Sequence, residues 1–435
     1  MADVQPLRGL RFNRKKVGDL AQVITPPFDV ISREAQERYY ERNPYNVIRL
    51  ELNRAEPTDN SLNNVYTRAA ATLAEWRLQG ILYEETDPYY YLYQQRFTHA
   101  DQSYTRTSLM ARVRLEPWEA RVVLPHEHTR TKDKEDRLNL LRACSTNFSP
   151  IMCLYDDPQA RIRRLLNEYA AQAEVQIVDE VGEEHRLQPI TDRQQVELIR
   201  DFFAERQLYI ADGHHRYTTA LNYREEIRAQ QRELHPMDGV NFVLMALIDL
   251  DDPGMLVLPT HRLLSGLSQE ALSTLSPQGL ARYFTVVSLN PATSSEAVLM
   301  QLAEVGEHIP SLVVKTAQQT LLLSLNEQGQ RRMEESKHSV AWNQLDVAIA
   351  QMLLLEDTLG ITAEDVAAGR YVRYSHDTQQ TLQQLQNGEA QAVILLNTTP
   401  LRQVCDVAQA DDRMPQKSTY IYPKLATGLV MNPLW

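Results

Sequence analysis

One short segment of the sequence gathers side chains that can bind anions and transfer protons. It contains Asp212, Gly213, His214, His215 and Arg216, and it lies between an apolar run and a long stretch with helical periodicity. This order predicts a strand, a tight turn and a helix. The first N–H groups of a helix lack intrahelical partners and carry the positive end of the helix dipole, so an anion can bind there. We therefore expect a phosphate or carboxylate site at this turn.

The five residues would contribute in different ways. Gly213 permits a close approach of the backbone, and His214 and Arg216 would hold phosphate oxygens. His215 would act as a catalytic group or as a further phosphate contact. Asp212 has three interpretations: the N-cap of the helix, a catalytic carboxylate that orients a nucleophile, or a metal ligand.

A second polar cluster has the sequence His126-Glu127-His128-Thr129. In an extended chain His126 and His128 lie on one side and Glu127 on the other, so the two imidazoles can ligate zinc or contact a phosphate. Three titratable groups in a row are expensive to bury, which favours a functional site. We expect His126 and Thr129 to contact phosphate, and Glu127 to serve as a catalytic carboxylate or metal ligand.

Three further positions are candidates with alternatives. Asp29 follows two prolines that fix extended backbone, so it is a placed catalytic carboxylate or part of a loop that ends a strand. His261 and Arg262 interrupt an apolar run, either to contact phosphate or as a salt-bridged core pair. Lys424 follows a proline in a turn, either as a phosphate contact or as an isolated surface lysine.

The elements that must position these residues predict an α/β fold with mixed sheets and a second, smaller α/β domain. Turn residues become more frequent after about residue 266, which predicts a domain boundary there. The domain 1–265 would carry most of the site, and the tail 417–430 of the domain 266–435 would return to it. We expect strands at 46–52, 89–98, 104–115, 241–250 and 257–264, and helices at 61–79, 214–234 and 339–359.

Composition restricts the class of protein. The formal net charge of −12 argues against a surface dedicated to nucleic acid or acidic membranes. The first residues lack the apolar core of a secretory signal, and no window approaches the roughly 18 apolar residues of a membrane-spanning helix. Three widely spaced cysteines fit a reducing compartment. We expect a cytoplasmic protein that binds a small-molecule substrate and a nucleotide, and for which a homodimer is one option.

Six motifs carry a family resemblance. They are Pro26-Pro27-Phe28-Asp29-Val30-Ile31, Pro125-His126-Glu127-x-Thr129, Asp136-Arg137-Leu138, Ala211-Asp212-Gly213-His214-His215-Arg216-Tyr217, Thr260-His261-Arg262 and Pro423-Lys424-x4-Leu429. Over nearly its full length the chain resembles a prokaryotic family catalogued as domain of unknown function 1015, for which no reaction is established. In that family the position of His128 is often arginine, which cannot ligate a metal and therefore speaks against zinc.

A more distant resemblance is to the ParB and sulfiredoxin superfamily, which includes the archaeal free serine kinases. In that superfamily a Gly-x-His-Arg turn at a helix start holds nucleotide phosphates. The segment from Gly213 to Arg216 is similar in kind, with one extra histidine. The resemblance implies a ParB/sulfiredoxin-like lobe around the central turn, in agreement with an anion site at a helix start.

These observations lead to one leading hypothesis and two alternatives. The leading hypothesis is a kinase-like phosphotransferase that uses ATP, ADP or CTP with Mg²⁺ and acts on a small hydroxylated metabolite. The first alternative is a metal-dependent hydrolase that holds zinc or manganese through His126, His128, Asp212, His214 and His261. The second is a non-catalytic sensor of a nucleotide or phosphometabolite.

Overall fold

The computed structural model describes residues 1–127, 131–230, 233–290 and 292–435, together with the side chains of all of these except 131–134. The chain divides into two compact units. Unit 1 comprises Met1–Pro125, Thr129–Met255 and Pro423–Trp435, and unit 2 comprises His126–His128 and Leu256–Tyr422. The two α/β domains expected at 1–265 and 266–435 stay a prediction.

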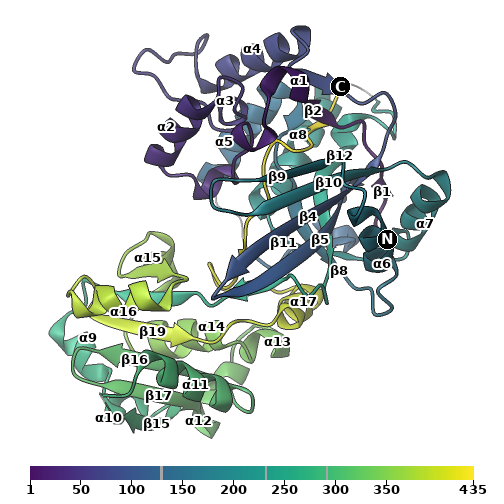
Figure 1. Cartoon of the computed structure of the whole chain (residues 1–435). Coiled ribbons are helices and arrows are strands. Elements are labelled where there is room, and N and C mark those ends of the chain that lie inside the picture. Colours follow the sequence, from purple (N-terminus) through teal and green to yellow (C-terminus); the bar gives the residue numbers. More distant parts are fainter. Residues whose placement is uncertain (128–130, 231–232, 291) are drawn as a thin grey trace. The chain divides into compact units, whose positions relative to one another are not determined.

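A nine-stranded mixed sheet forms the centre of unit 1 (Figure 1). Its order is β6-β11-β8-β12-β5-β4-β10-β9, with β1 paired to β5. The β11–β6 and β12–β8 pairs are parallel and the other pairs are antiparallel. The strands are β1 (Val4–Gln5), β4 (Tyr90–His99), β5 (Gln102–Arg114), β6 (Val123–Leu124), β8 (Ile151–Tyr155), β9 (Val175–Val178), β10 (Glu184–Ile190), β11 (Leu208–Asp212) and β12 (Phe242–Asp249).

Helices pack on the apolar face of this sheet. Leu109, Cys153, Ile210 and Leu247 belong to one buried cluster with Tyr217 of the helix that follows β11. The helices of unit 1 are α1 (Arg14–Val17), α2 (Arg33–Arg42), α3 (Ile48–Glu51), α4 (Val65–Leu78), α5 (Thr131–Cys144), α6 (Arg161–Ala170), α7 (Arg193–Phe203) and α8 (His214–Gln230). Two small antiparallel pairs complete it, β2 (Leu10–Phe12) with β3 (Leu82–Glu84) and β7 (Thr146–Asn147) with β21 (Asn432–Pro433).

Two strand predictions in unit 1 had opposite outcomes. The strands expected at 89–98 and 104–115 are confirmed as β4 and β5, a hairpin joined by Ala100 and Asp101, both of which have positive φ. The strand expected at 46–52 is wrong, because this segment forms the one-turn helix α3. The side chain of Asn46 accepts a hydrogen bond from the Ile48 N–H at 2.9 Å, which favours a helical turn over an extended chain.

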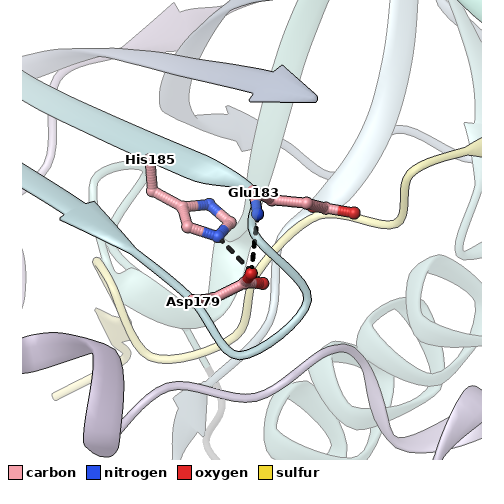
Figure 2. A group of neighbouring side chains, drawn as sticks. All are labelled: Asp179, Glu183 and His185. Atoms are coloured by element: carbon pink, nitrogen blue, oxygen red, sulfur yellow. Dashed lines mark hydrogen bonds and ion pairs between the residues drawn. The ribbon is translucent and has the colours of Figure 1, made fainter. Parts of the chain in front are cut away.

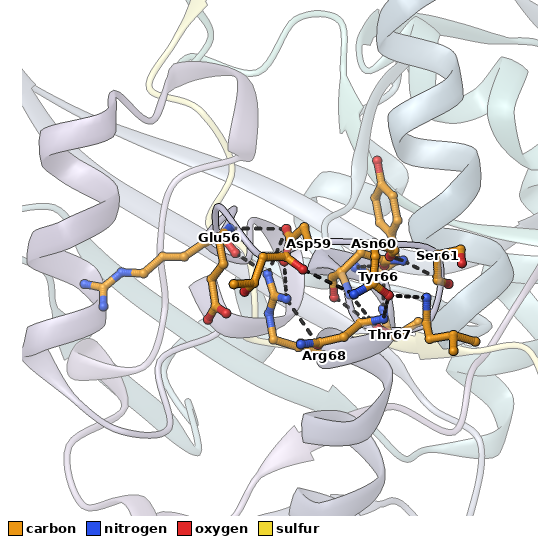
Figure 3. Close-up of polar contacts among 12 residues, drawn as sticks. Glu56, Asp59, Asn60, Ser61, Tyr66, Thr67 and Arg68 are labelled. Carbon is orange, nitrogen blue, oxygen red and sulfur yellow. Dashed lines mark hydrogen bonds and ion pairs between the residues drawn. The ribbon is translucent and has the colours of Figure 1, made fainter.

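The helix expected from residue 61 begins later, at Val65, because Asn64 caps it. The Asn64 side chain accepts from the N–H of Thr67, whose hydroxyl accepts from the N–H of Asn64, so the two form a capping box. Figure 3 shows how Arg68 on the first turn then holds the preceding loop. Its guanidinium donates to Asp59 at 2.5 Å and to the carbonyl of Arg54 at 2.6 Å.

Unit 2 contains a six-stranded antiparallel sheet of order β15-β17-β16-β19-β14-β18. The run 257–264, expected as one strand, is two: β13 pairs with β20 outside this sheet, and β14 starts after Pro259 and Thr260. The strands are β13 (Leu256–Leu258), β14 (His261–Leu264), β15 (Phe284–Leu289), β16 (Ser311–Thr316), β17 (Thr320–Leu325), β18 (Val372–Ser375), β19 (Ala392–Leu396) and β20 (Tyr420–Tyr422).

The long helix expected at 339–359 is interrupted. Leu345 is fully buried with an extended backbone, so α13 and α14 are separate turns, and the segment Ala350–Glu356 continues as a π-helix. Packing of Leu345 into the core outweighs the helical periodicity there. The helices of unit 2 are α9 (Gln269–Thr274), α10 (Pro277–Leu280), α11 (Ser295–Gly306), α12 (Glu327–Glu334), α13 (Val340–Asn343), α14 (Asp346–Ile349), α15 (Ala363–Ala367), α16 (Thr378–Gln386) and α17 (Leu401–Gln409).

The expected class, α/β with mixed sheets, is therefore confirmed. Cys144, Cys153 and Cys405 are buried, and none of the three is in a disulfide. In the described part of the chain, the structure contains no helix with the length and apolar character needed to cross a bilayer.

Candidate functional site

The central turn has the predicted order of strand, glycine and helix. β11 ends at Asp212 and α8 begins at His214, with Gly213 between them at φ +99°. The carbonyl of Gly213 accepts the N–H of Tyr217 at 3.1 Å, so Gly213 precedes the first helical residue. The interpretation of Asp212 as the helix cap is therefore wrong. A Cβ at Gly213 would be strained by the positive φ and would lie 3.0 Å from the guanidinium of Arg216, which would have to shift by a few tenths of an ångström.

Strand register places Asp212 on the same face of the sheet as Arg106. Asp212 pairs with Met152 after a β-bulge, Met152 pairs with Ala246, and Ala246 pairs with Met110. Directly paired residues point to the same face, and so do alternate residues along a strand. Arg106 is two such steps from Met110 along β5. This face is opposite the one that carries the apolar cluster under α8.

Both oxygens of the Asp212 carboxylate accept hydrogen bonds from cations. Arg216 Nη2 donates to Oδ2 at 2.9 Å, and Lys424 Nζ donates to Oδ1. The side chains of Arg216 and Lys424 are only 13% and 12% exposed, so these are partly desolvated ion pairs. Two cations from distant segments are thus fixed at the start of a helix of 17 residues.

The ion pairs also determine the protonation of Asp212. Burial acts to raise the pKa of this carboxyl, but the charges of Lys424 and Arg216, with His214 nearby, outweigh it and hold the pKa well below its usual range. Asp212 is consequently ionised at neutral pH. A carboxylate with a strongly lowered pKa is a weak general base.

The backbone around Lys424 is held by buried polar side chains on two strands. Gln95 Nε2 on β4 donates to the carbonyl of Lys424 at 2.9 Å. Arg106 Nη2 on β5 donates to the carbonyl of Pro423 at 2.8 Å and also to Gln95 Oε1. Figure 1 shows the C-terminal segment in yellow beside the strands of unit 1. These contacts fix the point from which the Lys424 side chain extends toward Asp212.

Arg106 is an unusual core residue. It is 1% exposed, and within the described residues its Nε and Nη1 have no hydrogen-bond partner and it forms no ion pair. Burial lowers the pKa of its guanidinium, an effect that Tyr93, Glu183 and more distant carboxylates oppose. Burying a cation without an ion pair costs free energy. Arg106 therefore places a costly positive group beside the backbone carbonyl of Pro423, next to Lys424.

A chain of hydrogen bonds supports the same segment from β10. The Ala426 N–H donates to the Tyr93 hydroxyl at 3.4 Å, which contacts His185 Nδ1 at 2.9 Å. His185 Nε2 in turn contacts Asp179 Oδ2 at 3.3 Å, as Figure 2 shows. Asp179, Glu183 and His185 are the one group in the described residues whose ligand atoms lie close enough to hold a metal ion. None of these three is a predicted metal ligand.

Arg216 connects the central turn to a second buried network. Its Nη1 donates to the carbonyl of Pro150 at 2.7 Å. The adjacent Ser149 donates to Glu51 Oε1 at 2.9 Å, and Arg137 Nη1 lies 3.5 Å from that oxygen. Burial raises the pKa of Glu51, because the charges of Arg137 and Arg216 offset only part of the desolvation. A cavity of about 50 Å³ lies among these side chains.

Asp29 lies near this network but is exposed. The two prolines before it continue into a short 3-10 helix, Phe28–Val30. The ring of Phe28 lies 4.0 Å from the guanidinium carbon of Arg137, a cation–π contact that links two of the six motifs. The Thr427 N–H donates to the carbonyl of Thr25 at 2.8 Å, which joins the proline segment to the C-terminal segment.

The remaining predicted residues belong to unit 2 or lie outside the described residues. The ring of His261 is fully engaged: Nδ1 accepts from the Leu396 N–H at 3.2 Å, so Nε2 carries the proton and donates to Thr378 at 2.9 Å. Burial lowers the pKa of His261 to about 4. Arg262 is buried, donates to the carbonyl of Thr260, and its pKa falls to about 10 because of burial.

His126 is likewise buried in unit 2, where its Nε2 lies 3.5 Å from Thr419 Oγ1. Glu127 is half-buried in the same unit. His128 and Thr129 lie outside the described residues. The structure thus assembles part of the predicted site within unit 1, and convergence of the rest stays a prediction. The assembled residues are Asp212, Gly213, His214, His215, Arg216 and Lys424.

Sequence reasoning missed Gln95, Arg106 and Glu51. Gln95 follows Tyr91 and Tyr93 and precedes Phe97 on one face of β4, and a polar residue at a predicted core position is a usable signal. Arg106 gave a weaker signal, because Ser108 and Arg112 on the same face of β5 are also polar. Glu51 gives no such signal, because in the strand expected at 46–52 it alternates with apolar residues, as an exposed residue would.

Comparison with known proteins identifies the family. The family model described as a protein of unknown function, DUF1015, matches residues 4–348, so the chain belongs to this family. Among curated proteins no match was found.

Several solved structures are similar to this one at low sequence identity. A conserved hypothetical protein from Pyrococcus furiosus is 11% identical with a TM-score of 0.36, over 74% of this chain and 95% of that one. Free serine kinase in complex with AMP is 11% identical with a TM-score of 0.37, over 74% and 92%. SbnI from Staphylococcus aureus, truncated at its C-terminus, is 12% identical with a TM-score of 0.36, over 75% and 87%. TM-scores this low do not establish a shared fold.

Proposed function

We propose that unit 1 binds the phosphate groups of a nucleoside phosphate at the start of α8 and transfers a phosphoryl group to a small hydroxylated metabolite. The observation that supports this most strongly is the double ion pair of Asp212 with Arg216 and Lys424 at the Gly213 turn. Phosphoryl transfer depends on positioning and on neutralising charge, and two ordered cations at a helix N-terminus provide both.

Within this proposal the side chains have distinct roles. Arg216 and Lys424 contact phosphate oxygens together with the N–H groups of the first turn of α8. Asp212 is a positioning residue that holds these two cations, because its lowered pKa makes it a weak base. Within unit 1, deprotonation or orientation of the acceptor hydroxyl then falls to His215 or Asp29.

Mg²⁺ does not fit at Asp212 in this arrangement. Both carboxylate oxygens already accept from cations, and a divalent ion there would face two positive charges. Magnesium in phosphotransferases is often bound mainly through the phosphates and water with one or two carboxylates. The metal-ligand role expected for Glu127, which belongs to unit 2, stays a prediction, and no step is assigned to the metal.

The sensor alternative has one specific observation in its favour. Asp212 is ion-paired with two cations and is therefore a poor general base. Binding of an anion by these cations needs no base, whereas phosphoryl transfer does. The hydrolase alternative has less support, because both ring nitrogens of His261 are engaged in hydrogen bonds within unit 2.

The test is thermal unfolding and calorimetric titration of the full chain with ATP, ADP and CTP, each with and without Mg²⁺. A ligand that binds only the folded protein raises its melting temperature. Wild type is compared with Arg216→Gln and with the matched control Arg228→Gln, which removes an exposed arginine from the far end of the same helix. We expect a nucleotide-dependent shift that R216Q loses and R228Q keeps.

Binding that is equal in R216Q and wild type would place the nucleotide elsewhere and refute the proposal. Turnover is then measured with a panel of hydroxylated metabolites as acceptors. Tight binding at this turn without phosphoryl transfer to any acceptor would establish the sensor alternative.

A further inference from the structure

Unit 2 contains a cavity of about 990 Å³ that is separate from the residues discussed above. It is enclosed by the end of α11, by α12 and α13, and by the segment that leads from β19 into α17. Cavities of roughly 300–1,000 Å³ are typical of sites for small molecules. Leu325 and Met333 are buried residues of its wall, so the cavity is partly apolar.

The charged side chains of this cavity are predominantly acidic. Glu307, Glu334 and Asp346 line it, and among its described lining residues there is no lysine or arginine. The one titratable group that can become positive there is His308. Clefts lined by one sign of charge concentrate ligands of the opposite sign, so this cavity favours a cation.

Asp346 is the most enclosed of the three acids. Its Oδ1 accepts from the Ser311 N–H at 3.1 Å, and its Oδ2 accepts from Asn397 Nδ2 at 3.2 Å. Both donors are neutral, and burial raises the pKa of Asp346 to about 6. The two neutral donors fix the carboxylate of Asp346 in place. Among the described residues no cationic side chain forms an ion pair with it.

We propose that this cavity binds a small molecule with a protonated nitrogen, an ammonium or amidinium group, which forms an ion pair with Asp346. The apolar wall at Leu325 and Met333 would contact the carbon skeleton of the ligand. This site is independent of the phosphate site proposed for unit 1, because no residue is shared between them.

The experiment uses two probes of nearly identical shape, benzamidine, which is cationic, and benzamide, which is neutral. Each is titrated into the full-length protein by calorimetry. We expect benzamidine to bind at least tenfold more tightly than benzamide. Asp346→Asn, which keeps the size of the side chain, should abolish this preference. The matched control Glu327→Gln removes an acidic charge from α12 outside the cavity and should leave the preference intact.

The pH dependence gives a second readout. Benzamidine stays protonated throughout, whereas Asp346 must be ionised to pair with it, so affinity should rise between about pH 5 and pH 7. Glu307, Glu334 and His308 also face the cavity, and the part of the pH dependence that remains in D346N belongs to them. If D346N loses most of the rise of benzamidine affinity with pH, the proposal is supported.

Three results would overturn the proposal: equal affinity for the two probes, no measurable binding of benzamidine, or unchanged benzamidine affinity in D346N. If D346N fails to fold, Ala303→Trp tests the same site by filling it, since Ala303 is an exposed lining residue. Benzamidine affinity that survives in A303W would likewise overturn the assignment.

Discussion

Asp212 and Lys424 are 212 positions apart in the sequence and form a direct ion pair. The other oxygen of the same carboxylate holds Arg216, so one acidic side chain determines where two basic side chains lie. Both ion pairs join groups within unit 1. The arrangement explains why a Pro-Lys turn near the C-terminus belongs to the same unit as the strand–turn–helix at 208–216.

Replacing Lys424 by Met should weaken nucleotide binding and leave the fold intact. A hydrogen bond to a charged group contributes about 1.5–3 kcal/mol, so nucleotide affinity should fall roughly tenfold or more.

Asp212→Asn should also weaken nucleotide binding, because Asp212 no longer holds Arg216 and Lys424 in place through its charge. Titration calorimetry with the nucleotide that stabilises wild type measures both. Tighter binding in D212N would contradict the positioning role and indicate that Asp212 only repels the phosphate.

Gln95→Leu should weaken nucleotide binding although it removes no charge. The mutation deletes the hydrogen bond that fixes the carbonyl of Lys424, so its effect should depend on the lysine side chain. In a double-mutant cycle with K424M we expect a coupling of about 0.5–3 kcal/mol. Gln94→Leu is the matched control, since the neighbouring Gln94 contacts Thr107 on the other face of the strand. Additive effects of Q95L and K424M would show that Gln95 acts by another route.

The central turn could be predicted from the sequence because its signal is local. An apolar run, a single glycine and helical periodicity define the junction from Leu208 to Arg216 within one segment. The role of Asp212 could not be predicted in this way. The position of Gly213 excludes Asp212 as the helix cap, and the ion pair of Asp212 with Lys424 joins residues far apart in the sequence, which local spacing does not reveal.

Other errors have the same origin. The segment 46–52 alternates polar and apolar residues as a strand does, yet the side chain of Asn46 and packing against the rest of unit 1 select one helical turn. At 339–359 the periodicity is helical throughout, and tertiary burial of Leu345 interrupts it. Gln95 and Arg106 lie opposite each other on β4 and β5, which only strand register reveals.

Breaking the buried pair of Glu51 and Arg137 should destabilise unit 1 strongly. Arg137→Met leaves the carboxylate of Glu51 buried without its nearest cation, which typically costs about 3–5 kcal/mol. The double variant with Glu51→Gln should recover most of this loss, because no buried charge remains. Urea unfolding measures the free energies.

The sign of the pH effect follows from Glu51. Burial raises the pKa of Glu51 in the folded state. As pH falls, Glu51 in R137M therefore becomes protonated in the folded protein first, which removes the unpaired buried charge. The loss in free energy of unfolding caused by R137M should shrink as pH falls toward about 4. A double variant as unstable as R137M at neutral pH would show that loss of the other contacts of Arg137, such as that of its guanidinium with the Phe28 ring, is responsible rather than the buried charge of Glu51.

His261 should make the stability of unit 2 depend on pH between about 6.5 and 4. Its pKa is lowered from 6.5 to about 4 in the folded state, because burial disfavours the charged ring. Between these values the unfolded chain binds a proton that the folded protein does not, so the stabilisation is complete above pH 6.5 and is lost as pH falls. At 1.36 kcal/mol per pKa unit the loss amounts to roughly 3 kcal/mol.

His261→Gln removes the titrating group and should flatten the free energy of unfolding over this interval. At pH 7.5 the variant should be less stable than wild type by about 1–3 kcal/mol, because the Leu396 N–H and Thr378 lose an ideal partner. Urea unfolding at a series of pH values measures both effects, with His308→Gln as a control for an exposed histidine of the same unit. If H261Q follows the wild-type slope, the pKa of His261 is not lowered in the folded protein, and its role as a buried neutral histidine at acidic pH is wrong.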